Sequence, residues 1–245
     1  MSKTRIACGV LSALVLLTAA LSGCGGDSFE IKVAKPANER PDFSDDIAAK
    51  GPLHMPSPTP FNLVSPSLRE NGICDAQCGA DPSGKAAASV EASDGGSGWA
   101  EFQVGYTFDL TGKQPIAAVV EVTVDMTQVI EVSSLDLANT AKVNVILMVK
   151  DSNGTTLHSD TLLANNSESG ARSWAARPTI AFDVKFAPDF GYYVVVAARI
   201  EAASAAGQKA SARLEMKQCE MTISWKKDAP LSDACPAAPP AVALR

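Results

Sequence analysis

The sequence predicts an all-β protein, an antiparallel two-sheet sandwich of seven to eight strands. The first observation is a strict alternation over 102–110, where the even-numbered residues are apolar and the odd-numbered ones are mostly polar. Residues 120–127 repeat this period of two, which places one side of a strand in a core and the other in water. The second observation is that Gly, Asn and Pro turns separate the alternating segments, while no segment has a clear helical period. Many short alternating strands joined by such turns are typical of a sandwich.

The remaining strands follow in order along the chain. A weaker strand is expected over 86–92, and 143–149 is apolar at nearly every residue, as in a strand covered on both faces. Asp-Ser-Asn-Gly at 151–154 predicts a tight hairpin that leads into a returning strand. Further strands are expected over 180–186, 192–202 and 214–225. In the last of them the apolar parity changes between Met216 and Cys219, which predicts a β-bulge.

The first residues have the three zones of a secretory signal peptide. Lys3 and Arg5 give a positive start, and an apolar run over 11–20 follows. This run is too short to span a bilayer permanently, and it ends in the small-residue stretch Leu21-Ser22-Gly23-Cys24. Residues 1–23 are therefore predicted to be a signal peptide.

The stretch Leu21-Ser22-Gly23-Cys24 resembles the lipobox of bacterial lipoproteins. The resemblance implies diacylglyceryl transfer to the Cys24 thiol, cleavage before Cys24 and fatty acylation of the new amino end, for example with palmitate. Two or three acyl chains on one residue anchor a protein stably, so the membrane is an expected partner. In Gram-negative lipoproteins an Asp directly after the cysteine favours inner-membrane retention. Gly25 stands there instead, and the resemblance therefore points to the outer membrane.

Proline content divides the rest of the chain. Residues 24–70 hold seven of the 15 prolines and no periodicity, so we expect an extended, lipidated tether there. The sandwich domain is expected over 71–226. Four more prolines fall in 227–245, which is predicted to be an irregular tail.

Net charge excludes one class of partner. Removal of residues 1–23 takes away Lys3 and Arg5, and the remaining 19 basic and 27 acidic residues give a net charge of −8. Such a balance argues against nucleic acid as a partner.

Four cysteines remain after cleavage and lipidation: Cys74, Cys78, Cys219 and Cys235. An even number in an exported chain predicts two disulfides, with three connectivities open. We prefer at least one bridge between the first two and the last two cysteines over the local pairing of 74 with 78 and 219 with 235. The Cys-x-x-x-Cys spacing at 74–78 could also hold a metal, but the chain has only two histidines and is expected to be exported, so no metal site is expected.

Asp189-Phe190-Gly191-Tyr192-Tyr193 resembles the tyrosine corner of immunoglobulin-like domains. The resemblance implies that the Tyr193 ring is buried and that its hydroxyl bonds to nearby backbone, with Tyr192 on the opposite face. Val195 stands where antibody domains have a cysteine, so only a structural role is implied. An immunoglobulin-like sandwich and a jelly roll remain the two candidate topologies.

Material for catalysis is scarce. The two histidines are His54, in the expected tether, and His158, for which we expect a solvent-facing place on a strand; no Gly-x-Ser-x-Gly motif is present. Oxygen atoms of Asp151, Asn153 and Asp160 could gather around calcium, although a hairpin already explains the first two. We expect no catalytic residue, no metal and no cofactor.

The candidate binding residues are two tryptophans and two arginines. The connection over 164–178 is expected to be a long loop that carries Arg172, Trp174 and Arg177. Long loops are often functional, and a Trp between arginines could stack on a sugar or anchor a protein partner. The alternative is that Trp174 folds back over one end of the sandwich. Trp99, at the start of a strand, has the same two interpretations.

These observations predict a lipid-anchored protein of the cell envelope with a non-enzymatic binding or structural domain. The expected partner is an envelope protein or a glycan. The alternative is an enzyme or an enzyme inhibitor with a site built from loops.

Overall fold

The computed structural model describes residues 40–44, 47–134, 139–166 and 170–226. The predictions for the signal peptide, for Cys24 and for the tail over 227–245 lie outside these residues. Within the described part, no helix is long and apolar enough to cross a membrane. The elements are β1 (Asp42–Phe43), η1 (Ile47–Ala49), β2 (Leu53–Met55), β3 (Leu63–Asn71), β4 (Cys74–Ala80), β5 (Ala86–Ser93), β6 (Ser97–Leu110), β7 (Ile116–Val132), β8 (Thr140–Asp151), β9 (Thr156–Asn166), β10 (Gly170–Ala176), β11 (Thr179–Phe186), β12 (Phe190–Ala203) and β13 (Lys209–Trp225).

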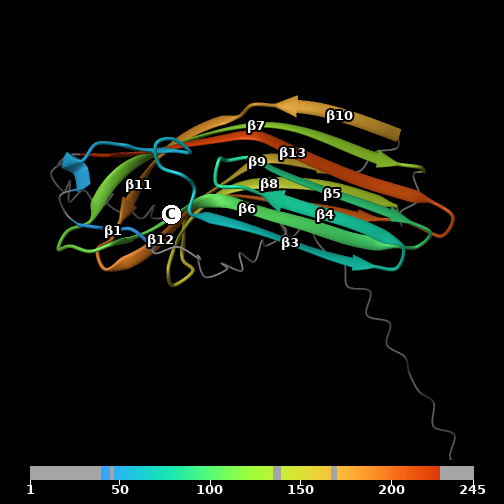
Figure 1. Cartoon of the computed structure of the whole chain (residues 1–245), viewed down its shortest axis with the longest axis horizontal. Helices are drawn as coiled ribbons and strands as arrows, with labels where there is room; N and C mark the ends of the chain where they lie inside the picture. The colour runs from blue at the N-terminus through green and yellow to red at the C-terminus, as the bar shows by residue number, and fades with distance from the viewer. Residues whose placement is uncertain (1–39, 45–46, 135–138, 167–169, 227–245) are drawn as a thin grey trace, which may run out of the picture. The chain divides into compact units, whose positions relative to one another are not determined.

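The strands form two sheets that pack as a sandwich, which confirms the predicted fold class (Figure 1). The six-stranded sheet has the order β1-β6-β12-β8-β9, and β3 also pairs with β6. The seven-stranded sheet has the order β10-β7-β13-β5-β4, with β11 also on β7 and β2 also on β13. β10 and β11 pair with successive parts of β7, so together they act as one edge strand.

The connectivity is that of a jelly roll. When β10 and β11 are counted as one, the order β5-β13-β7-β10/β11 faces the order β6-β12-β8-β9. Two four-stranded sheets wound in this way are the two Greek keys of an eight-stranded jelly roll, with β1 to β4 as additions. The jelly roll is therefore the correct alternative, and the immunoglobulin-like resemblance is wrong.

The predicted alternation builds the core. On β6 the even-numbered residues from Ala100 to Leu110 point inward, and on β12 so do those from Tyr192 to Ala202. The bulge predicted in the last strand is confirmed as a register shift between Met216 and Gln218 on β13. The hairpin at 151–154 is confirmed as well. The Asp151 carboxylate accepts backbone N–H groups of Asn153 at 2.9 Å and Thr155 at 2.8 Å, so the turn employs it and needs no calcium.

The extended tether predicted over 24–70 is wrong for its second part. Residues from Arg40 onward form β1, η1, β2 and β3, and they place four buried side chains in the domain: Ile47, Met55, Phe61 and Leu63. Prolines are compatible with this because they lie between short strands or on the edge strand β3, where a missing N–H costs little. The domain therefore begins at or before Arg40 rather than at residue 71.

The predicted pair of disulfides is also wrong. Cys74, Cys78 and Cys219 are free thiols, and any pairing of four cysteines into two bridges includes one bridge among these three. Cys74 and Cys78 lie four residues apart on β4, about 13 Å, beyond the span of a disulfide. Cys219 lies on β13, with β5 between it and β4. A bridge to Cys235 would involve a residue outside the described part of the chain.

The described thiols belong to the interior rather than to a reactive site. The Cys78 thiol donates to the Glu101 carbonyl oxygen at 3.0 Å, and desolvation by burial raises its pKa to about 11. Burial raises the pKa of the Cys219 thiol to about 12. Because the thiolate is the nucleophile and the metal ligand, neither thiol suits chemistry at neutral pH.

The corner tyrosine is Tyr192, not Tyr193. The Tyr192 ring is buried at 2% exposure, and its hydroxyl donates to the Ala187 carbonyl oxygen at 2.7 Å. Tyr193 points away from the core, because adjacent strand residues face opposite sides. Burial of the Tyr192 phenol also raises its pKa, with the Ala187 hydrogen bond acting in the opposite direction. The predicted hydrogen bond to backbone thus exists, one residue from the predicted place.

Tyr192→Phe should lower the free energy of unfolding by about 1–3 kcal/mol, because it leaves a carbonyl without its donor while the ring packing stays. Tyr193→Phe, which removes a hydroxyl on the outer face, is the matched control and should change stability by less. Urea denaturation of the unlipidated chain from Gly25 onward measures both. A larger loss for Tyr193→Phe would contradict the assignment.

Candidate functional site

The outer face of the six-stranded sheet, which points away from the seven-stranded sheet, carries its accessible polar groups at two ends. The middle of this face is apolar, and its side chains are buried at 9% exposure or less although they do not belong to the core: Leu63, Ile146, Met148, Val195 and Ala197. The register places these five on rows that cross β3, β6, β12 and β8. Polar side chains that a ligand could contact therefore lie toward the two ends of the face.

At one end a row of four side chains crosses four strands. Arg69 on β3 lies opposite Trp99 on β6, Trp99 opposite Glu201 on β12, and Glu201 opposite Lys142 on β8. Trp99 is half-buried and faces outward, since its neighbour Ala100 points into the core. The residue singled out in the sequence thus stands on a sheet face among charged side chains.

Arg199 organises this end of the face, which is called here the Trp99 end. Its guanidinium carbon lies 4.9 Å from the centre of the Trp99 ring, a cation–π contact that fixes the indole. Its Nε donates to the Glu201 carboxylate at 2.7 Å, and the Glu101 carboxylate lies 4.0 Å from Nη1. Gln103 in turn donates to Glu101 at 3.2 Å. The planar side chains are therefore held by one another before any ligand arrives.

Two acceptor oxygens on the outer face near Arg199 lack donors. The side-chain oxygens of Gln103 and Asn144 are buried and make no hydrogen bond in the structure. Gln103 is only 3% exposed. A buried acceptor without a donor costs about 1–3 kcal/mol, so a bridging water molecule would be favoured there.

A hollow of about 440 Å³ opens beside Trp99. Its lining comes from β3, β6, β8 and β12 and consists of Arg69, Asn71, Ser97, Gly98, Trp99, Thr140, Glu201, Ala202 and Ala203. One aromatic ring with arginine, asparagine, serine, threonine and glutamate around it can stack on one face of a ligand and hydrogen-bond its edge.

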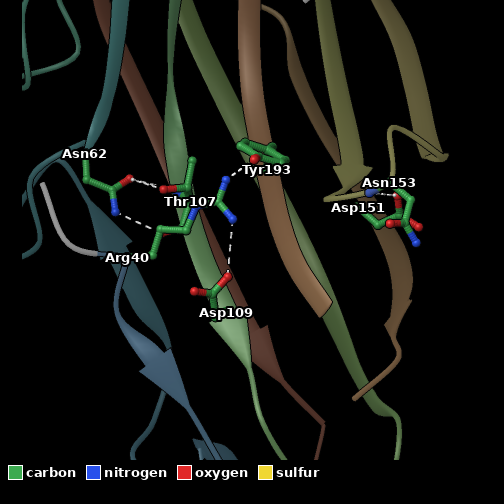
Figure 2. Close-up of polar contacts among 7 residues, drawn as sticks. All are labelled: Arg40, Asn62, Thr107, Asp109, Asp151, Asn153 and Tyr193. Atoms are coloured by element: carbon green, nitrogen blue, oxygen red, sulfur yellow. Dashed lines mark hydrogen bonds and ion pairs between the residues drawn. The ribbon is translucent and has the colours of Figure 1, made fainter. Parts of the chain in front are cut away.

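At the other end of the same face, Arg40 holds the start of the domain. Figure 2 shows its guanidinium between Tyr193 and Asp109, with Asn62 beside Thr107. Arg40 Nη1 lies 3.3 Å from the Asp109 carboxylate, Nη2 donates to the Tyr193 hydroxyl, and the guanidinium carbon lies 4.5 Å from the ring centre. A side chain at Gly191 would collide with Arg40 and Asp109. Arg40 thus ties the Tyr193 ring and the Asp109 carboxylate to the start of the domain at this end.

The other predicted binding residues lie on β10 of the opposite sheet or directly after it. The long loop expected over 164–178 is wrong, because β9 extends to Asn166 and β10 begins at Gly170. Trp174 lies on the paired strand β10 opposite Gln128, and it is half-buried against the core. Arg172 and Arg177 are exposed. The structure therefore does not bring Trp99 and Trp174 together.

His158 is not the solvent-facing residue that was expected. Its ring is half-buried and stacks on Phe182 of β11, with 3.5 Å between ring centres and 4° between planes. Nε2 lies 2.5 Å from the Asp160 carboxylate. The contact joins an edge strand of each sheet, so His158 closes the side of the sandwich. In the described part of the chain no three His, Cys, Asp or Glu side chains form a group that could hold a metal ion.

A larger hollow, about 650 Å³, lies at one end of the seven-stranded sheet. Its charged lining consists of Asp75, Glu91, Glu131 and Lys209, and Asp75 lies directly opposite Glu91. Since its lining has no aromatic ring, it offers a ligand no stacking surface, and the smaller hollow at Trp99 is the better site.

Several residues of the Trp99 end were missed in the sequence: Arg69, Glu101, Gln103, Lys142, Asn144, Arg199 and Glu201. The available signal was local. Arg199 and Glu201 are the only charged residues in an apolar strand, and they stand two apart, so they share a face. Which strands lie beside them could not be read from periodicity.

No protein-family model and no curated protein sequence matches the chain. Among solved structures, one that concerns the promiscuous specificity of carbohydrate-binding modules from the β-sandwich superfamily is 10% identical to this chain. The match covers 67% of this chain and 57% of that chain, with a TM-score of 0.26. The xylan-binding domain of Paenibacillus barcinonensis Xyn10C shares 12%, with 66% and 88% covered and a TM-score of 0.21. The glycoside hydrolase domain Endo-D of Streptococcus pneumoniae R6 shares 10%, with 64% and 21% covered and a TM-score of 0.25. All three TM-scores lie below 0.5.

Proposed function

We propose that this chain is a lipid-anchored envelope lipoprotein whose jelly-roll domain binds a glycan, without catalysis, at the Trp99 end of the six-stranded sheet. The observation that carries the glycan proposal is the half-buried Trp99 ring, fixed by Arg199 and set in a hollow lined with hydrogen-bonding side chains. A sugar has an apolar ring face and a rim of hydroxyl groups. Stacking and planar polar side chains suit these two surfaces together.

The polar side chains that line the hollow support the same ligand class. Sugar hydroxyls are donors as well as acceptors, so they suit both the Glu201 carboxylate and the Arg69 guanidinium of the lining. The network of Arg199, Glu201 and Glu101 exists without ligand, which lowers the ordering cost of binding.

The test of glycan binding uses the mature lipoprotein in a non-ionic detergent and native gels that contain one polysaccharide each. The panel holds xylan, mixed-linkage β-glucan, polygalacturonate and peptidoglycan fragments. Retardation by at least one polymer, relative to a non-binding reference protein, is the expected result. Equal migration in every gel would contradict the proposal.

A second candidate function, glycoside hydrolysis, rests on one observation: two carboxylates, Glu101 and Glu201, lie around the same guanidinium. Glycoside hydrolases employ a pair of carboxylic acids. Release of new reducing ends from a retarded polymer, lost in Glu101→Gln, would favour this second function over binding alone.

The anchor is proposed on the lipobox residues Leu21-Ser22-Gly23-Cys24. Cys24→Ser should abolish lipidation and leave the precursor uncleaved, because the thiol is the acceptor of diacylglycerol. Metabolic labelling with a palmitate analogue, followed by membrane fractionation, measures both effects. Cys74→Ser is the control and should keep its label. Label retained on the Cys24→Ser protein would contradict the anchor.

A further inference from the structure

We propose that the glycan bound at the Trp99 end is acidic, and that Arg69, with Lys142 across the row, binds the anionic group of the sugar over Trp99. This inference rests on the proposed glycan binding and names the ligand class of the same site. The shared chemistry is an anionic oxygen group, either a carboxylate or a sulfate ester.

The first observation is which charged side chains near Trp99 already form ion pairs. The Glu201 carboxylate forms an ion pair with Arg199 Nε at 2.7 Å, and the Glu101 carboxylate lies 4.0 Å from Nη1 of the same guanidinium. Arg69 and Lys142, in contrast, make no ion pair with any residue of the described chain, although Lys142 lies directly opposite Glu201. Arg69 and Lys142 therefore have no counter-ion among the described residues, while Glu101 and Glu201 share the single guanidinium of Arg199.

The second observation is the sign of this patch in an acidic protein. Arg69, Lys142 and Arg199 against Glu101 and Glu201 leave a local surplus of one positive charge, whereas the whole chain has a net charge of −6. A positive patch on a negative protein concentrates anionic ligands at that place. These charged side chains lie on the row of Trp99 and on the row next to it.

The third observation is geometry. Arg69 lies on the strand next to Trp99, about 5 Å away across the sheet, and its side chain is exposed. Lys142 lies two strands from Trp99 on the other side, about 10 Å away. A substituent on the edge of a sugar stacked at Trp99 is thus within reach of a guanidinium, which binds carboxylate and sulfate oxygens through two parallel hydrogen bonds.

The experiment compares matched pairs of polymers by calorimetric titration of the mature lipoprotein in non-ionic detergent. One pair is polygalacturonate and the same polymer after reduction of its carboxyl groups to alcohols. The other pair is dextran sulfate and dextran. We expect the charged member of at least one pair to bind about tenfold more tightly or better, as for a charge-assisted hydrogen bond, and the pair identifies which anionic group is bound.

Arg69→Gln should remove most of this preference, lowering affinity for the charged polymer far more than affinity for its neutral partner. Lys142→Gln should act in the same direction with a smaller effect. The matched control is Arg213→Gln, an identical change of charge at an exposed residue on the seven-stranded sheet. Equal affinities within both pairs would overturn the inference, and so would equal losses in Arg69→Gln and Arg213→Gln. Neutral glycans bound through Trp99 with no preference for charge would overturn it while leaving glycan binding intact.

Discussion

Trp99→Ala is expected to reduce glycan affinity by about 30-fold or more. A central aromatic anchor is commonly worth at least ~2 kcal/mol of binding free energy, and about 1.4 kcal/mol corresponds to tenfold. The Trp99 ring has no role in the core, so the variant should fold. Retardation in native gels that contain the bound polysaccharide measures the change.

Trp174→Ala is the matched control, because Trp174 is also half-buried but lies on β10 of the other sheet. It should lose some stability through its core contacts and keep full affinity. If Trp174→Ala abolished binding while Trp99→Ala kept it, the site would have to be moved to the seven-stranded sheet.

Phe108→Ala should lower the free energy of unfolding by about 3–5 kcal/mol. Phe108 is fully buried and lies at the centre of an aromatic cluster, with ring centres 5.3 Å from Phe186, 5.5 Å from Tyr192 and 5.7 Å from Trp225. The cluster joins β6 and β12 to β11 and β13, so the cavity left by the ring would open between the two sheets. Urea denaturation measures the loss.

Leu68→Ala is the control for this prediction. Leu68 lies on β3 and is 47% exposed, so its truncation should lower the free energy of unfolding far less. Similar midpoints for Phe108→Ala and Leu68→Ala would contradict the assignment of the core.

The strands were predictable because burial on one side leaves a period of two in the sequence. Phe102 to Leu110 and Ile180 to Phe186 were read correctly in this way, and the Met216 bulge was visible as a change of parity. The prediction that Tyr193, and not Tyr192, is the buried tyrosine was wrong for a related reason. Either of two adjacent aromatic residues can continue an apolar run, and only the contact with Ala187 decides between them.

The predictions of the domain start and of the disulfides were wrong because both features depend on which strands lie side by side. Short strands such as β2 and β1 leave no periodicity, yet their pairing with β13 and β6 covers the ends of the core. Counting cysteines cannot show that β5 separates Cys78 from Cys219. The Trp99 end was not predicted for the same reason. Arg69 and Arg199 are 130 residues apart in the chain, and they come near each other because β3 and β12 both pair with β6.

Hydroxyl-radical footprinting of the mature lipoprotein, with and without a saturating polysaccharide that retards it, tests the binding site most directly. The chain has three tryptophans, and mass spectrometry can measure the oxidation of each one separately. Protection of Trp99, with unchanged oxidation of Trp174 and Trp225, is the predicted result. Protection of Trp174 with unchanged oxidation of Trp99 would contradict a glycan site on the six-stranded sheet.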